Sequence, residues 1–347
     1  MGNSTRLTGV VQALRRRASR EALRVVVGTG GRAARYWATH APALQAEILA
    51  LESYRFAERQ EQSLSLGWGG FLRPRNARLY ARNSRLLNAF LGENSVDAAL
   101  IDSDYHVLPL LSSGVPITAL GQASDVVRRC AADRGVPSVS TGALLIERLD
   151  AAFQRAVSLR TLVPAFEPID FGIARATAVP LIVREEFTVP VAAPIGGPEA
   201  VRVVLSGSGI GSAPLLAWAR RHSLTVLDSL GGDSWAVDAQ GRPVVDRASA
   251  VVIQGGLSSI SECIARRRKM IVVPIPGHAE QRANAFEVER RGLGLSVAEL
   301  SEPPGALLER LARSTIATQD IHWPRVDGAK VVAGILLESL GLADARA

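Results

Sequence analysis

The stretch that decides the fold runs from Gln254 to Glu262, QGGLSSISE, and continues through 270–276, MIVVPIP, and 280–285, EQRANA. The apolar residues 250–253 before it predict a buried strand that runs into a Gly-Gly turn and then a helix. A second apolar strand follows, and another helix begins at EQRANA. This order predicts a parallel sheet in which two helix N-termini open at the same edge.

That sheet edge suits an anionic ligand, because the first backbone N–H groups of a helix are unpaired and its dipole adds positive potential. We expect Glu262 in the first helical turn, where its carboxylate can accept hydrogen bonds from a sugar diol. A phosphate bound by the backbone amides and a ribose bound by the Glu262 carboxylate together indicate a nucleoside-diphosphate ligand. A second interpretation stays open, in which Ser259 and Glu262 form an S-x-x-E capping box that only stabilises the helix.

The order of these residues resembles the donor half of the GT-B glycosyltransferases. It is most similar to the branch that contains the bacterial enzyme transferring N-acetylglucosamine to the lipid-linked peptidoglycan precursor. The family pattern is Gly-Gly, a few small residues, Glu, an apolar strand ending in Pro, and then Gln-x-x-Asn-Ala. All of these elements occur here in order, from Gly255 to Ala285.

The resemblance implies an α/β protein with two Rossmann-like domains that face a cleft, and a C-terminal helix that packs back on the first domain. The Pro- and Gly-rich stretch 189–200 predicts the linker. We therefore expect an acceptor-binding domain at 1–188, a nucleotide-sugar-binding domain at 201–320 and the returning helix within 321–347. Outside the decisive stretch, apolar runs predict strands at 23–27 and 48–51, among others.

The implied activity is a hexosyl- or N-acetylhexosaminyl-transferase of bacterial cell-envelope or glycan biosynthesis. It would move a sugar, with inversion, from a nucleotide-diphosphate sugar, UDP-linked, to an acceptor hydroxyl. We expect no metal and no other cofactor, because helix amides can neutralise the leaving diphosphate. The D-x-D sequence at 102–104 looks like a metal motif, but two acids do not make a metal site.

The donor-site residues follow from the resemblance. The diphosphate is expected near the Gly-rich turn 206–209 and the helix start at Ser258, the ribose at Glu262, and the sugar at Gln281 and Asn284. The predicted donor-binding residues are Ser206, Gly207, Ser208, Gly209, Gly255, Gly256, Ser258, Glu262, His278, Glu280, Gln281 and Asn284.

The N-terminal sequence aligns with a loop of the type Gly-x-Gly-His-x-x-Arg that follows the first strand in related enzymes. No residues are left for that strand, so we predict that the first strand of the N-terminal sheet is missing. A sheet without its central strand would expose apolar edges. The resemblance places acceptor binding at Gly2, Asn3, Ser4 and Arg6.

Asn3 occupies the catalytic position at which many relatives carry His, and an amide does not titrate. Another group must then accept the acceptor's proton, and Asp104 and His106, just after the strand 96–101, are the candidates. The alternative is that Asp102 and Asp104 cap the following helix.

Composition favours a globular cytoplasmic protein. The chain has 347 residues, 47% of them hydrophobic, and no apolar run of about 18 residues that would span a membrane. The start is polar and unlike a signal peptide. Cys130 and Cys263 are far apart and predict free thiols in a reducing compartment.

Charge is concentrated in the first half, where residues 1–180 hold 22 Arg against 15 acidic residues; residues 181–347 hold 18 basic and 18 acidic residues. With the segment 68–75, WGGFLRPR, this allows peripheral contact with the inner face of the cytoplasmic membrane. A partly buried loop explains that segment equally well. The acceptor is left open as lipid-linked, a glycan or a small molecule, and no nucleic-acid-binding motif occurs.

Two other functions stay open. Because the expected base is absent, the chain can be a non-catalytic nucleotide-sugar-binding or regulatory subunit of the same fold. A sugar-nucleotide 2-epimerase shares the scaffold, although residues 276–281, PGHAEQ, do not resemble the corresponding epimerase loop.

Overall fold

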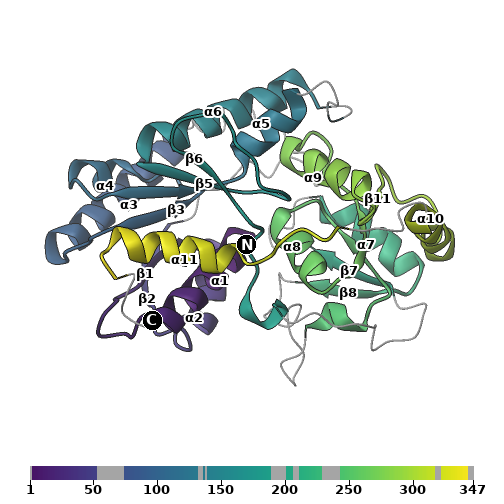
Figure 1. The fold of residues 1–347 in the computed structure, drawn as a ribbon, viewed down its shortest axis with the longest axis horizontal. Coiled ribbons are helices and arrows are strands. Elements are labelled where there is room, and N and C mark those ends of the chain that lie inside the picture. Colours follow the sequence, from purple (N-terminus) through teal and green to yellow (C-terminus); the bar gives the residue numbers. More distant parts are fainter. Residues whose placement is uncertain are drawn as a thin grey trace.

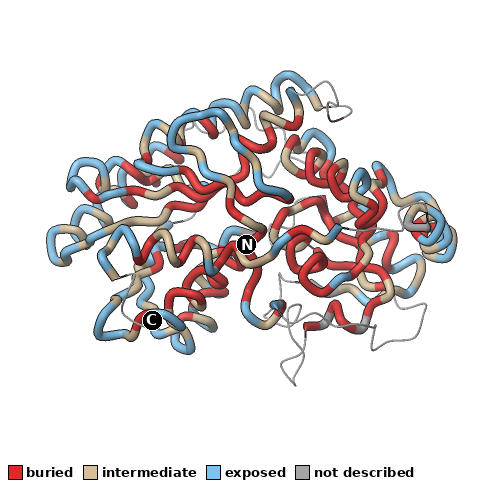
Figure 2. The backbone as a smooth tube through the Cα atoms, in the orientation of Figure 1, coloured by how far each residue is buried: buried red, intermediate tan, exposed pale blue. Residues whose placement is uncertain are grey.

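The computed structural model describes residues 2–52, 74–131, 136, 139–188, 201–205, 211–228, 243–316 and 322–342. It shows two α/β halves side by side, joined by the crossing C-terminal segment (Figure 1). Figure 2 shows buried residues along the strands of both halves and on the sides of the helices that face them. The predicted two-domain α/β fold is therefore confirmed.

The C-terminal half contains one parallel sheet in the order β11-β10-β9-β7-β8. Its strands are β7 (Val201–Leu205), β8 (Thr225–Asp228), β9 (Ala250–Ile253), β10 (Lys269–Val272) and β11 (Gly294–Ser296). Its helices are α7 (Ser212–Arg221), α8 (Leu257–Ala265), α9 (Ala279–Arg290) and α10 (Pro304–Ile316), with a short 3-10 turn at Val244–Arg247. Every residue of β9 is buried, as expected for a central strand covered on both faces.

The N-terminal half contains two separate parallel sheets among the described residues, β1-β2 and β3-β4-β5-β6. The strands are β1 (Val26–Gly30), β2 (Glu47–Leu51), β3 (Ala99–Asp102), β4 (Ile117–Leu120), β5 (Arg160–Pro164) and β6 (Ala176–Val179). The helices are α1 (Gly2–Arg17), α2 (Gly31–His40), α3 (Pro74–Glu93), α4 (Leu108–Ser112), α5 (Ala123–Ala131) and α6 (Thr141–Val157), followed by a 3-10 turn, η2 (Glu185–Phe187).

Helix α1 spans both of these sheets. Val10 packs in the cluster that contains Leu120 and Leu162 of the larger sheet, and Val11 packs with Val27 of the smaller one. No described strand precedes α1, and β1 and β3 each end a sheet.

Two local predictions for this half were wrong. The first strand pattern, expected at 23–27, lies three residues later because β1 takes its register from parallel pairing with β2, from Val26 opposite Glu47 to Gly30 opposite Leu51. The residues expected to form the N-terminal loop, from Gly2 to Arg6, are instead the first turn of α1. Tertiary packing overrides the weak helix propensity of this Gly-, Asn- and Ser-containing stretch.

The last helix, α11 (Gly328–Ser339), returns to the N-terminal half as expected and packs against α1 through Val332, Ala333 and Leu336. The segment that brings it back runs beside the end of the N-terminal half. Leu181 N–H donates to the Arg325 carbonyl at 3.1 Å, and Ile182 forms an antiparallel bridge with Asp327. The end of the N-terminal half and the returning segment therefore lie next to each other.

Candidate donor and acceptor site

The Gly-Gly turn after β9 brings the two predicted donor helices together. A Cβ on Gly255 would lie 2.5 Å from the Gln281 carbonyl oxygen, so only glycine permits this close approach of α9. Gly256 is the N-cap of α8 and the helix begins at Leu257. The capping-box interpretation is therefore wrong, because Ser259 already lies inside the helix, and Glu262 lies in the second helical turn rather than the first.

Glu262 is buried between the two halves, with 2% of its surface exposed. Its Oε1 accepts a hydrogen bond from Arg184 Nε at 2.8 Å and lies 2.7 Å from Arg184 Nη2 in the same ion pair. Its Oε2 is buried and has no hydrogen-bond partner among the described residues. Burial raises the pKa of Glu262 to about 7, and the charge of Arg184 opposes this shift.

Arg184 comes from the end of the N-terminal half, at the N-cap of η2. Its guanidinium lies 4.9 Å from the ring centroid of Phe187 and 3.5 Å from Glu186. The pair with Glu262 therefore crosses from one half to the other. One carboxylate oxygen is held by Arg184, and the other is left to accept from a further donor such as a ligand hydroxyl.

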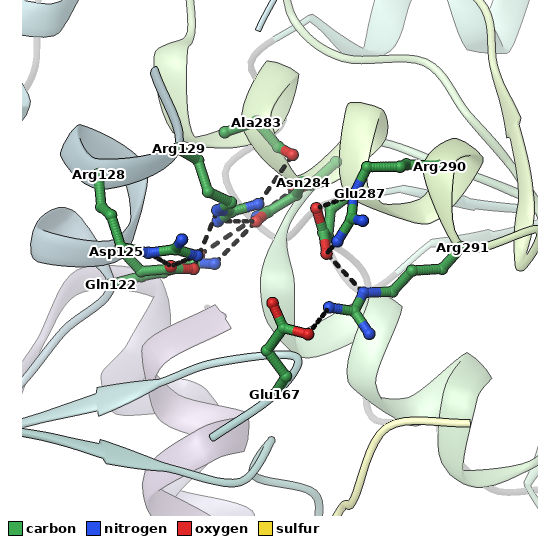
Figure 3. Close-up of polar contacts among 11 residues, drawn as sticks. Gln122, Asp125, Arg128, Arg129, Glu167, Ala283, Asn284, Glu287, Arg290 and Arg291 are labelled. Atoms are coloured by element: carbon green, nitrogen blue, oxygen red, sulfur yellow. Dashed lines mark hydrogen bonds and ion pairs between the residues drawn. The ribbon is translucent and has the colours of Figure 1, made fainter. Parts of the chain in front are cut away.

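Asn284, the predicted sugar ligand, is fully buried at the second contact between the halves (Figure 3). Its Oδ1 lies 2.7 Å from Gln122 Nε2 and 3.0 Å from Arg129 Nη2, both on the N-terminal side. Its Nδ2 donates to the Gly255 carbonyl at 3.0 Å. In this arrangement Asn284 joins the two halves. Its bonds to Gln122 and Arg129 would have to break before its side chain could bind a sugar.

The other predicted donor residues surround the start of α9. Gln281 is buried, and its Oε1 accepts the Ile275 backbone N–H at 2.9 Å. His278 is the N-cap of α9, and burial lowers the pKa of its imidazole, which favours the neutral ring. Glu280 is half-buried in the first turn, and Ser258 is half-buried in the first turn of α8. Ser206, Gly207, Ser208 and Gly209 lie outside the described residues.

The predicted acceptor residues lie at the start of α1, beside the end of β3. Gly2 is the first residue of the helix, and Ser4 is buried. The exposed Asn3 donates from Nδ2 to the Asp102 carbonyl at 3.0 Å. Arg6 forms a buried ion pair with Asp102, with Nε 2.9 Å from Oδ2. Burial raises the pKa of the Asp102 carboxyl even with Arg6 beside it.

The two predicted bases bind each other. His106 is buried, with Nδ1 2.8 Å from Asp104 Oδ1 and Nε2 2.9 Å from the Asn83 amide. Asp104 also accepts the backbone N–H of His106 at 2.8 Å. Burial opposes the change, but these bonds lower the pKa of Asp104, which makes it a weaker proton acceptor. Because α4 starts only at Leu108, the interpretation of Asp104 as a cap of that helix is also wrong.

Sequence reasoning missed the groups that the N-terminal half contributes to these contacts. They are Gln122, Arg129, Glu147, Asp150 and Arg184. The only local signal was the i, i+3 spacing of Glu147 and Asp150, which is also typical of a solvated helix face.

Within the part of the chain that the structure describes, no group of three or more His, Cys, Asp or Glu side chains is arranged to hold a metal ion. None of the described helices is long and apolar enough to cross a membrane.

Two parallel-sheet halves with facing loop edges and a returning C-terminal helix define the GT-B fold. The glycosyltransferase family 28 C-terminal domain matches residues 234–319. The MurG structure from Acinetobacter baumannii is 13% identical, with 97% of this chain and 96% of that chain covered and a TM-score of 0.55. The LpCGTa structure in complex with UDP is 15% identical, with 97% and 90% covered and a TM-score of 0.55.

An uncharacterised glycosyltransferase from Methanopyrus kandleri is 36% identical over 100 residues, which is 26% of this chain and 27% of that protein. The match thus spans about a quarter of this curated relative. Together with the structural neighbours, these matches identify the chain as a GT-B protein that resembles the MurG-like enzymes.

Proposed function

We propose that the chain is a glycosyltransferase that binds a nucleotide-diphosphate sugar to its C-terminal half and transfers the sugar to an acceptor hydroxyl. The family 28 domain match covers Glu262 and Asn284. The neighbour LpCGTa was solved with UDP, which supports a UDP-linked donor here. The sugar is a hexose or N-acetylhexosamine in this proposal, and the acceptor stays open as lipid-linked, a glycan or a small molecule.

The observation that carries the proposal is the unpartnered Oε2 of Glu262. A buried carboxylate oxygen without a donor is costly, and a ribose hydroxyl would remove that cost. The N-terminus of α8 lies at the same sheet edge and offers backbone amides to the diphosphate. The donor would then bind as one extended molecule, with its ribose at Glu262, its diphosphate at the start of α8 and its sugar towards Gln281. These residues form the donor path.

The proposed reaction inverts the anomeric centre and needs no metal. The acceptor hydroxyl, bound near Asn3 and Arg6 on α1, attacks the anomeric carbon in line as the diphosphate leaves. Helix amides stabilise the developing negative charge. Since Glu262 and Asn284 are both buried against the N-terminal half, the halves must separate to admit the donor and close again over it.

A non-catalytic nucleotide-sugar-binding role is the second candidate. It is favoured by the non-titrating Asn3 and by the bonds that already engage both ring nitrogens of His106. Turnover of a donor, measured as release of its nucleoside diphosphate, distinguishes the two roles.

The test is a thermal-shift panel of nucleoside diphosphates and nucleotide-sugars, with and without EDTA. A ligand at a hundredfold excess over its Kd stabilises the native state by about 2.7 kcal/mol. We expect one nucleotide series to raise the melting temperature of the wild type regardless of EDTA. Glu262→Gln should lose the shift, and Glu299→Ala, at an exposed carboxylate, should keep it. An equal shift in Glu262→Gln refutes the donor site.

A further inference from the structure

Helix α6 places two carboxyl groups, Glu147 and Asp150, against the start of α9. They are one helical turn apart and half-buried. Glu147 lies near the backbone N–H of Glu280, the second residue of α9, which favours the charged form of its carboxyl. Figure 1 shows α5 and α6 of the N-terminal half meeting α9 at this point. The pair therefore lies beside the predicted sugar-binding helix, on the acceptor side.

Asp150 is held in one orientation by two neutral donors. Tyr105 Oη donates to Oδ1 at 3.1 Å, and Gln154 Nε2 donates to Oδ2 at 2.9 Å. A carboxylate has about four lone-pair positions, so two such bonds leave room for a hydroxyl donor. Unlike Glu262 and Asp102, which are almost fully buried, Asp150 is partly open to solvent and can be reached by an acceptor.

A second, independent feature points to a ligand at this place. The Gln154 side chain is 2% exposed, and its Oε1 has no hydrogen-bond partner among the described residues. The amide fits there only because residue 121 is glycine, since a Cβ on Gly121 would lie 2.5 Å from Gln154 Nε2. A buried amide oxygen without a donor, next to Asp150, matches a ligand that brings hydroxyl groups.

The electrostatics give the two carboxyls different roles. Burial and the nearby charges of Glu280 and Asp150 raise the pKa of Glu147 to about 8, although Arg129 on α5 opposes the shift. Burial raises the pKa of Asp150 to about 6; the Tyr105 bond limits this rise, and the charges of Glu280 and Asp102 add to it. Near pH 7, Glu147 is then mostly protonated and Asp150 mostly ionised, as in a pair that supplies one acid and one base.

We propose that the acceptor bound near Asn3 and Arg6 extends to Asp150 and Gln154, and that Asp150 takes the proton of its reacting hydroxyl during transfer. The inference rests on the proposed glycosyltransferase function. The hydroxyl oxygen forms a bond to the anomeric carbon while the bond from that carbon to the diphosphate breaks. The electron pair of the broken bond leaves with the nucleoside diphosphate, and the hydroxyl proton moves to an Asp150 carboxylate oxygen.

The experiment follows UDP release from UDP-N-acetylglucosamine and UDP-glucose between pH 5 and 9, with water and then octyl β-glucoside as the hydroxyl acceptor. We expect the wild-type rate to rise through pH about 6. Asp150→Asn should lower kcat by roughly 10² to 10⁴-fold, the usual contribution of a general base. Asp150→Glu should recover part of the rate and keep a rising limb, which loss of structure alone would not produce.

Controls separate this assignment from the function on which it rests. Asp97→Asn, at an exposed carboxylate, should match the wild type. Asp150→Asn should keep the UDP thermal shift, because Asp150 is not on the donor path. If the wild type is active and Asp150→Asn is equally active with an unchanged pH profile, the assignment of Asp150 as the base is overturned, and the transferase function is not. If the wild type binds UDP but releases no UDP from UDP-N-acetylglucosamine or UDP-glucose, the transferase function itself is overturned. The role of Asp150 as its base is then overturned as well.

Discussion

Replacing Arg184 with Met tests the buried pair that closes the predicted donor site. The Arg184 and Glu262 side chains are 1% and 3% exposed, so solvent screens their interaction little. Removing one partner of a buried pair leaves an uncompensated charge and costs about 3–5 kcal/mol. We expect Arg184→Met to lose that much unfolding free energy at pH 8.

The loss should depend on pH, with a sign fixed by Glu262. Its folded pKa of about 7 lies above the ordinary value of 4.5, so the folded state holds a proton that the unfolded state releases. That contribution to stability, roughly 3 kcal/mol, is fully present below pH 4.5 and is lost as pH rises through 7. Without Arg184 the pKa of Glu262 rises further. At pH 5 Glu262 is neutral in both folded proteins, so the cost should be smaller than at pH 8 by about 1 kcal/mol, because pH 8 lies one unit above the wild-type pKa of about 7.

The assay is urea unfolding of the wild type and Arg184→Met at pH 5, 6.5 and 8. Arg16→Met is the matched control, because Arg16 pairs with Glu185 at the surface with both side chains 48% exposed and should lose less than about 1 kcal/mol. The double variant Arg184→Met with Glu262→Gln should recover much of the loss at pH 8. A destabilisation of Arg184→Met that is equal at pH 5 and pH 8 would refute the reasoning.

Two further predictions concern the contacts of α9 and α6. Asn284→Leu should remove about 1–3 kcal/mol of unfolding free energy, because Gln122 and Arg129 lose their buried partner; unchanged urea unfolding would contradict this. Tyr105→Phe removes a bond that lowers the pKa of Asp150, so the rising limb of the rate should move to higher pH; a profile that stays in place would show that this bond does not tune the base.

The sequence predicted the C-terminal half well because its signals are local. The apolar run Ala250–Ile253, the Gly-Gly turn and the helix start behind it each depend on neighbouring residues, and the structure forms them in that order. The start of α1 was placed wrongly because its helix is stabilised by packing on α11 and α8, which lie far away in the sequence.

The candidate site was less predictable than the fold because its contacts join distant residues. Arg184 meets Glu262 across 78 positions, and Gln122 meets Asn284 across 162. Sequence patterns identify which side chains can bind ligand, but they do not show which of them already bind one another. His106 illustrates this difference, since both of its ring nitrogens already have protein partners.

The paired segments 181–182 and 325–327 also affect how the two halves can separate. Residues 181–182 and 325–327 run side by side and are hydrogen-bonded, so the end of the N-terminal half and the returning segment are tied together at one place. Two halves tied together at one place can separate by a hinge rotation about that place. A small twist of these few residues would then open the contact between α6 and α9, while α11 would stay packed on α1.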